Sequence, residues 1–119
     1  MKKVYYLSTC DTCSRILKEL DLDDGFQLQD IKYEKITAEQ LDQMRLLGGS
    51  YESLFSRVAR KYKELGLKDK NLSEEDYKNY ILNEYTFLKR PVFIINDRIF
   101  VGNSKKNIEG LSNYLKTIE

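Results

Sequence analysis

The chain has 119 residues, of which 41% are hydrophobic, enough for the core of one ordinary domain and too many for a disordered protein. Lys and Arg number 20 against 19 Asp and Glu, so the net charge of +1 gives no global basic field for direct nucleic-acid binding. No apolar run approaches the ~20 residues that cross a bilayer, and the segment after Met1 is too short for a signal peptide, so we expect a cytoplasmic protein without membrane contact.

Histidine is absent, which excludes Cys-His and Ser-His-Asp catalysis and removes the commonest zinc ligand. The two cysteines cannot complete a four-ligand structural zinc site by themselves, and we expect no bound metal or cofactor. In the cytosol both thiols are expected to be reduced at rest. Any nucleophile must therefore be activated by something other than imidazole.

The first third of the chain predicts a β-α-β unit. Residues 3–7 are β-branched and aromatic, which is typical of a buried strand. Helical spacing starts after Cys10 and stops at Gly25, with an apolar stripe formed by Ile16, Leu17 and Leu20. Residues 26–31 alternate with period two, which predicts a half-buried strand.

Helical patterns fill the middle of the chain. Residues 37–40 form a capping box, and Gly48-Gly49 ends the helix that follows. Residues 54–65 predict a second helix stopping at Gly66, with a stripe formed by Leu54, Phe55, Val58, Tyr62 and Leu65. Ser73 begins a third helix, whose buried side carries Tyr77, Tyr80, Ile81 and Tyr85.

The last third predicts a β-hairpin and a terminal helix. Residues 91–95 and 98–101 are the strands, joined at Asn96-Asp97, and residues 102–104 cap a helix carrying Ile108, Leu111 and Leu115. The element order predicts an α/β protein with a thioredoxin-like, mixed four-stranded sheet flanked by helices. We expect one domain over residues 1–119, with a helical insertion at about 37–88 between the second strand and the hairpin.

Cys10 and Cys13 carry the strongest chemical signal. They directly follow the first strand, at the start of the first helix, where backbone N–H groups and the helix dipole stabilise a thiolate. Such placement can lower a cysteine pKa from ~8.5 to roughly 3.5–7.5. We therefore predict that Cys10 is a nucleophilic thiolate. Cys13 fits either a resolving thiol or an ordinary helix-packing residue.

Pro91, the only proline, opens the hairpin. A strand-initial proline is compatible with ordinary sheet geometry, but in a thioredoxin-like fold a cis proline at this point packs against the active cysteine. Arg90 would then lie beside the thiolate and could hold an oxyanion, and Arg57 is a second candidate for that task. Thr12 lies in the loop around the thiol, where we prefer a capping role.

The sequence resembles the ArsC/Spx family, which contains arsenate reductase-like proteins and Spx-type transcriptional regulators. The resemblance covers nearly the whole chain and rests on four stretches: residues 6–13 (YLSTCDTC), 54–57 (LFSR) with 62–67 (YKELGL), 88–91 (LKRP) and 101–102 (VG). It implies a glutaredoxin-like reductase whose Cys10 attacks an oxyanion or a disulfide. Glutathione or a glutaredoxin would be the co-substrate, and the anion would be held by Arg57 and Arg90, with Thr12 and Pro91 completing the site.

Two departures from the arsenate reductase pattern bear on the substrate. Asn103 stands where that class has a third arginine, which weakens oxyanion binding, and Cys13 permits an internal disulfide that the class commonly lacks. The Cys-x-x-Cys spacing resembles the Spx branch, which implies an alternative function. In that alternative the chain is a redox-sensing regulator that binds the C-terminal domain of the RNA polymerase α-subunit without turnover. We expect a monomer in either case.

Overall fold

The computed structural model describes residues 1–118, and these fall into two compact units. The first unit contains Met1–Glu34 together with the chain from Arg90 onward, and the second contains Lys35–Lys89. The first unit carries the whole β-sheet, and the second consists of helices and short 3-10 turns. The chain thus leaves the first unit after its second strand and returns to it immediately before its third.

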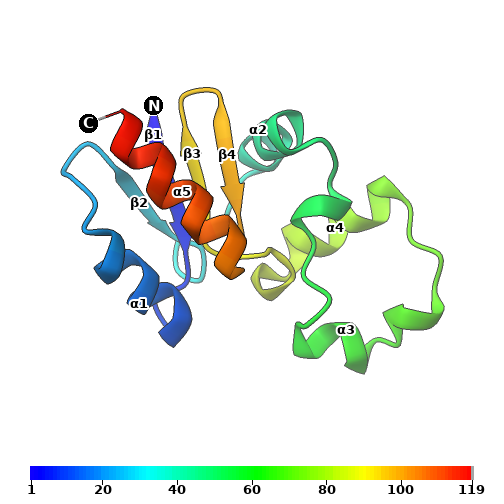
Figure 1. Cartoon of the computed structure of the whole chain (residues 1–119). Coiled ribbons are helices and arrows are strands. Elements are labelled where there is room, and N and C mark those ends of the chain that lie inside the picture. Colours follow the sequence, from blue (N-terminus) through cyan, green and yellow to red (C-terminus); the bar gives the residue numbers. More distant parts are fainter. Residues whose placement is uncertain (119) are drawn as a thin grey trace. The chain divides into compact units, whose positions relative to one another are not determined.

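The first unit is built on a mixed four-stranded sheet with the order β2-β1-β3-β4 (Figure 1). The strands are β1 (Lys2–Tyr6), β2 (Gln27–Asp30), β3 (Val92–Ile95) and β4 (Arg98–Val101). β1 pairs parallel with β2 and antiparallel with β3, and β3 pairs antiparallel with β4. The predicted mixed sheet and its terminal hairpin are therefore confirmed.

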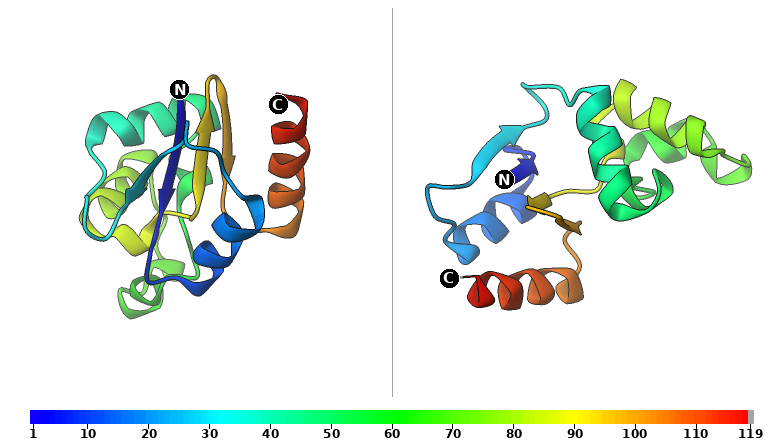
Figure 2. Two further views of the ribbon diagram at one scale, coloured as in Figure 1. Left: turned by 90° about the vertical axis from the view of Figure 1, so that its left-hand side faces the viewer. Right: turned by 90° about the horizontal axis from the view of Figure 1, so that it is seen from above.

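Two helices, α1 (Asp11–Leu20) and α5 (Lys105–Thr117), cover the same face of this sheet (Figure 2). Between them and the sheet lies one hydrophobic core, formed by Val4, Ile16, Phe26, Phe93, Ile95, Phe100 and Leu111. Because α1 packs on the sheet directly after β1, its first turn is held at the carboxyl end of that strand. This end of the unit carries both cysteines.

α1 ends earlier than its sequence pattern suggests. We expected the helical segment to close at Gly25, but the helix stops at Leu20 and Asp21 takes the left-handed conformation, with φ 48°. Aspartate tolerates this conformation better than most non-glycine residues do, because its short polar side chain can hydrogen-bond locally. Gly25 instead belongs to a turn before β2, where its N–H donates to Oδ1 of Asp23 at 2.8 Å.

β2 forms as predicted, but its side chains do not alternate between buried and exposed as the pattern of residues 26–31 predicts, and its buried position is polar. Gln29 is buried, whereas the neighbouring Leu28 is 57% exposed. The side-chain amide of Gln29 donates to the carbonyl oxygen of Glu34 at 3.0 Å, so burial does not leave this donor unsatisfied. The hydrogen bond ties the turn after β2 back to the strand.

The second unit contains two regular helices that begin as predicted. Thr37 is the N-cap residue of α2 (Ala38–Gly48), and Ser73 is the N-cap residue of α4 (Glu74–Asn83). Each of these caps forms a complete capping box, which satisfies orphan N–H groups of the first turn. Gly49, with φ 100°, ends α2 in a conformation that favours glycine. The remaining elements are α3 (Arg60–Glu64), η1 (Glu52–Leu54), η2 (Leu67–Asp69) and η3 (Tyr85–Phe87).

The prediction of one continuous helix over residues 54–65 is wrong. Phe55 forms an isolated antiparallel bridge with Leu88, and the N–H of Ser56 donates to the carbonyl of Phe87 at 2.7 Å. This pairing holds the backbone extended, so only the short α3 is helical and Val58 is 94% exposed. Leu65 is also exposed, and Tyr85 lies in η3 rather than on the buried side of α4.

Aromatic packing explains why Phe55 pairs with Leu88 instead of continuing a helix. The Phe55 ring stacks on Phe87 with centroids 5.0 Å apart and meets Tyr77 edge-on at 4.9 Å. Burial of large rings in this way dominates the energetics of a small core. The extended segment 55–56 is what places Phe55 between these two partners.

None of the helices among residues 1–118 has the length and apolar character needed to span a membrane.

Two leucines of α2 provide a matched test of this packing. Leu41 is fully buried and Leu46 is 77% exposed. We expect Leu41→Ala to lower the free energy of unfolding by about 2–5 kcal/mol, because it leaves a cavity, and Leu46→Ala to change it by less than about 0.5 kcal/mol. Urea denaturation followed by circular dichroism measures both. Equal losses would contradict the assignment of Leu41 to the core.

Candidate active site

Cys10 is the N-cap residue of α1. Its backbone is extended, with φ −98° and ψ 113°, and its N–H donates to the carbonyl of Leu7 at 3.0 Å. Its own carbonyl accepts from the N–H of Ser14 at 3.1 Å and so begins the helical hydrogen-bond ladder. The sulfur therefore stands at the positive end of the helix, half-buried, where N–H groups of the first turn lack helical partners.

Several groups act on the ionisation of Cys10. Partial burial is the largest influence and by itself raises the pKa of the thiol. The backbone N–H and the thiol of Cys13, the charge of Arg90 and the N–H of Thr12 together outweigh burial, so the pKa lies below its usual value.

The pKa of the Cys13 thiol is displaced in the opposite direction, above its usual value. Its side chain is fully buried, and burial raises the pKa of its thiol to about 11, although the N–H of Leu7 opposes this. The nearby Cys10 sulfur raises the pKa further, because a second negative charge beside the first is unfavourable. The thiol of Cys13 instead hydrogen-bonds to Cys10. At neutral pH the proton thus stays on Cys13 and favours the anion on Cys10.

Arg90 and Pro91 belong to the same unit as the cysteines. The peptide bond between them is cis, and Pro91 is buried. The Pro91 carbonyl accepts from the N–H of Gly102 at 2.9 Å, which fixes the start of the hairpin. Arg90 is half-buried, and its charge lowers the pKa of both cysteine thiols. The pairing of β1 with β3 thus brings Arg90 to the thiols although it lies far from them in the sequence.

Thr12 acts on the site through its backbone. Its N–H lowers the pKa of Cys10, and its side chain is half-buried. Arg15, one turn further along α1, is exposed, as is Asn103 after the last strand. An oxyanion-binding role for Thr12 stays a prediction.

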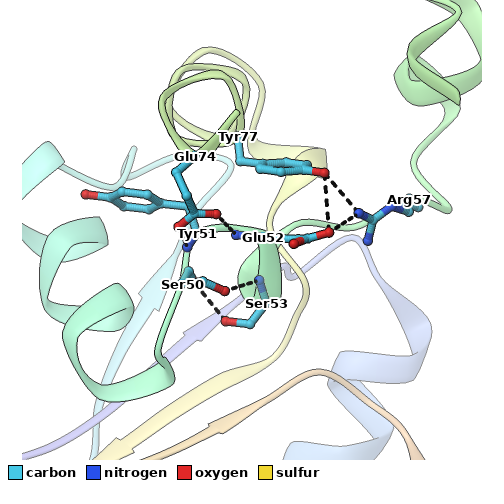
Figure 3. A network of polar contacts seen from close by, with 7 residues as sticks. All are labelled: Ser50, Tyr51, Glu52, Ser53, Arg57, Glu74 and Tyr77. Atoms are coloured by element: carbon cyan, nitrogen blue, oxygen red, sulfur yellow. Dashed lines mark hydrogen bonds and ion pairs between the residues drawn. The ribbon is translucent and has the colours of Figure 1, made fainter. Parts of the chain in front are cut away.

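Arg57 belongs to the second unit, in the loop after the bridge at Phe55, and not on a helix. Its Nη2 donates to Oε2 of Glu52 at 2.7 Å and to the hydroxyl of Tyr77 at 3.0 Å (Figure 3). The hydrogen bond to Glu52 is the main reason that the pKa of the guanidinium is raised, so Arg57 is firmly cationic. Its role as an oxyanion ligand stays a prediction.

Glu52 and Tyr77 had no functional signal in the sequence. They lie five residues before and twenty residues after Arg57, in spacings that no regular element brings together. Tyr77 was expected only as a core residue of its helix, and its ring is indeed buried. No group of three or more Cys, Asp or Glu side chains among residues 1–118 is arranged to hold a metal ion.

A family model for the ArsC family matches residues 5–111. The chain belongs to the ArsC family. Both cysteines, both candidate arginines and the cis proline lie within the matched residues. No curated protein matches the sequence at a significant level.

Solved structures of ArsC-type proteins share the fold. An ArsC family related protein from Bacteroides fragilis is 23% identical with a TM-score of 0.76, and the match covers 92% of this chain and 96% of that one. A possible arsenate reductase from Streptococcus mutans is 26% identical with a TM-score of 0.70, covering 93% and 97%. An arsenate reductase from Vibrio cholerae is 21% identical with a TM-score of 0.70, covering 92% and 94%. These similarities confirm the thioredoxin-like fold.

The charge of Arg90 provides a test of how Cys10 is activated. We expect Arg90→Ala to raise the pKa of Cys10, since a charge that favours the thiolate is lost, and therefore to slow its alkylation by iodoacetamide at pH 7. The alkylation rate measured from pH 5 to 10, with the site identified by mass spectrometry, gives the pKa. Arg15→Ala removes an exposed arginine of α1 and is the matched control. An unshifted profile in Arg90→Ala would contradict this activation.

Proposed function

We propose that the protein is a thiol-dependent reductase in which the Cys10 thiolate is the nucleophile and Cys13 is the resolving thiol. The observation that supports this most directly is the opposite displacement of the two thiol pKa values, with Cys10 below its usual value and Cys13 at about 11. A reductase needs one sulfur ionised and accessible and a second that stays protonated until it is needed. Cys10 is half-buried and Cys13 fully buried, which suits this division of roles.

With a disulfide substrate the chemistry uses only these two sulfurs. The Cys10 thiolate attacks one substrate sulfur, a bond forms between them, and the other substrate sulfur leaves as a thiolate. Cys13 then loses its proton to solvent or to the leaving thiolate and attacks the Cys10 sulfur. The second substrate thiolate leaves and a Cys10–Cys13 disulfide remains. The substrate gains two electrons, and a glutathione or glutaredoxin thiol pair returns them to the protein.

With arsenate, the same thiolate would attack arsenic, and an arsenate oxygen would leave as water after protonation. A glutathione thiolate would then attack the Cys10 sulfur. The S–As bond would break with its electron pair going to arsenic, which becomes arsenic(III), and a Cys10–glutathione disulfide would remain. We propose that Arg90, whose charge lowers the pKa of Cys10, also stabilises this oxyanion, and that Arg57 is its second ligand.

A second candidate function is a redox-sensing regulator that binds the α-subunit of RNA polymerase in one redox state. The hydrogen bond from the Cys13 thiol to Cys10 favours it, because two sulfurs in such contact can close a disulfide. The regulator would form this disulfide without turning over a substrate. Its binding to the isolated C-terminal domain of the α-subunit would differ between the reduced and oxidised protein, which titration calorimetry measures.

We expect Cys10→Ser to abolish reduction of 2-hydroxyethyl disulfide, because serine supplies no comparable nucleophile at neutral pH. Without glutathione, Cys13→Ser should react once and then accumulate a mixed disulfide at Cys10, visible as an added mass, because no second thiol of the chain resolves it. Turnover coupled to glutathione, glutaredoxin and glutathione reductase, followed by NADPH absorbance, measures the first effect, and mass spectrometry of the glutathione-free reaction measures the second. Residual turnover in Cys10→Ser would contradict the proposed function.

A further inference from the structure

Hydrogen bonds to a carboxylate of α4 hold residues 51–52, at the start of η1, against that helix (Figure 3). The carboxylate of Glu74, in the first turn of α4, accepts from the N–H of Tyr51 at 2.7 Å and from that of Glu52 at 3.0 Å. Ser50 and Ser53 add hydrogen bonds within the segment. The backbone of Glu52 is therefore held by α4, and its side chain points toward Arg57.

Glu52, Arg57 and Tyr77 form a closed triangle of hydrogen bonds. Nη2 of Arg57 donates to the Glu52 carboxylate at 2.7 Å and to the Tyr77 hydroxyl at 3.0 Å, and that hydroxyl donates to Glu52 at 3.4 Å. The guanidinium also lies over the Tyr77 ring, 5.7 Å from its centroid. The Tyr77 ring is buried against Phe55, so its hydroxyl is a fixed acceptor.

The identity of the donor atom matters for anion binding. A guanidinium binds a carboxylate, phosphate or arsenate through one of two edges, each of which offers a pair of parallel N–H groups. One edge uses Nε and Nη2 and the other uses Nη1 and Nη2, so both include Nη2. Because Nη2 of Arg57 already donates to Glu52 and to Tyr77, an oxyanion gains a bidentate contact only by displacing an internal acceptor.

We propose that Glu52 and Tyr77 are specificity-determining residues that compete with oxyanions for Arg57 and so favour disulfide over oxyanion substrates. This rests on the proposed function, in which Cys10 is the nucleophile and Arg57 is available to a substrate anion. Asn103, in place of a third arginine, acts in the same direction. An uncharged disulfide needs no guanidinium, so the competition does not affect it.

The size of the effect follows from the exposure of the ion pair. The side chains of Arg57 and Glu52 are 46% and 55% exposed, so solvent screens their charges. An internal competitor of this kind should weaken arsenate binding by about fivefold, the equivalent of ~1 kcal/mol. The two hydrogen bonds of Tyr77 should contribute about twofold of this.

The test measures how strongly arsenate protects Cys10 from iodoacetamide. We expect Glu52→Gln, which keeps the shape of the side chain and removes its charge, to lower the half-protecting arsenate concentration by about fivefold. Tyr77→Phe, which keeps the ring in its aromatic contacts, should lower it by about twofold. Glu64→Gln is the control, since Glu64 pairs with Lys61 at 3.7 Å and its loss makes the same change in net charge.

The gain must also depend on Arg57. In an Arg57→Ala background, Glu52→Gln should leave arsenate protection unchanged. An equal gain from Glu64→Gln, a gain that survives in the Arg57→Ala background, or no gain from Glu52→Gln in folded protein would each overturn the proposal. The two hypotheses fail separately. If Cys10→Ser still turns over a disulfide, the proposed function is overturned. If turnover depends on Cys10 but Glu52→Gln leaves arsenate protection unchanged, only the competition for Arg57 is overturned.

Discussion

The opposite displacement of two pKa values, lowered for Cys10 and raised to about 11 for Cys13, determines which thiol of the site ionises first and can react. Burial opposes ionisation at both positions, but only Cys10 receives enough compensation from backbone N–H groups, the Cys13 thiol and Arg90. The same contact that lowers the pKa of Cys10 raises that of Cys13. The two thiols therefore titrate together, and a substitution at either sulfur changes the ionisation of the other.

The fold supplies this arrangement through the pairing of β1 with β2 and β3. α1 begins directly after β1, which brings its N-terminus to one end of the sheet, and β3 enters beside β1 from a distant part of the sequence. Arg90 precedes β3, so its charge reaches the sulfurs through strand pairing and not through any local motif. A chain without histidine thus lowers the pKa of a thiol with N–H groups of a helix end, a neighbouring thiol and one guanidinium.

Elements with local signals could be predicted from the sequence, and those set by distant contacts could not. The capping boxes at Thr37 and Ser73, the hairpin and the strand before Cys10 all have their signals within a few residues. The helix predicted over 54–65 failed because Phe55 and Ser56 pair with residues more than thirty positions away. Tyr77 was missed as a partner of Arg57 for the same reason, since it reaches the loop of Arg57 from α4.

This distinction matters for inferring a substrate from family motifs. A motif records that an arginine stands at position 57, but anion binding depends on which of its N–H groups remain available. In this chain Nη2 already serves Glu52 and Tyr77, and Asn103 removes a further cation that the resemblance would have supplied. The pKa of Cys10 is lowered by the N–H groups of Cys13 and Thr12, the Cys13 thiol and Arg90, whereas the proposed competition acts on Arg57. Nucleophile and anion receptor can therefore diverge independently within one fold, because different hydrogen bonds control them.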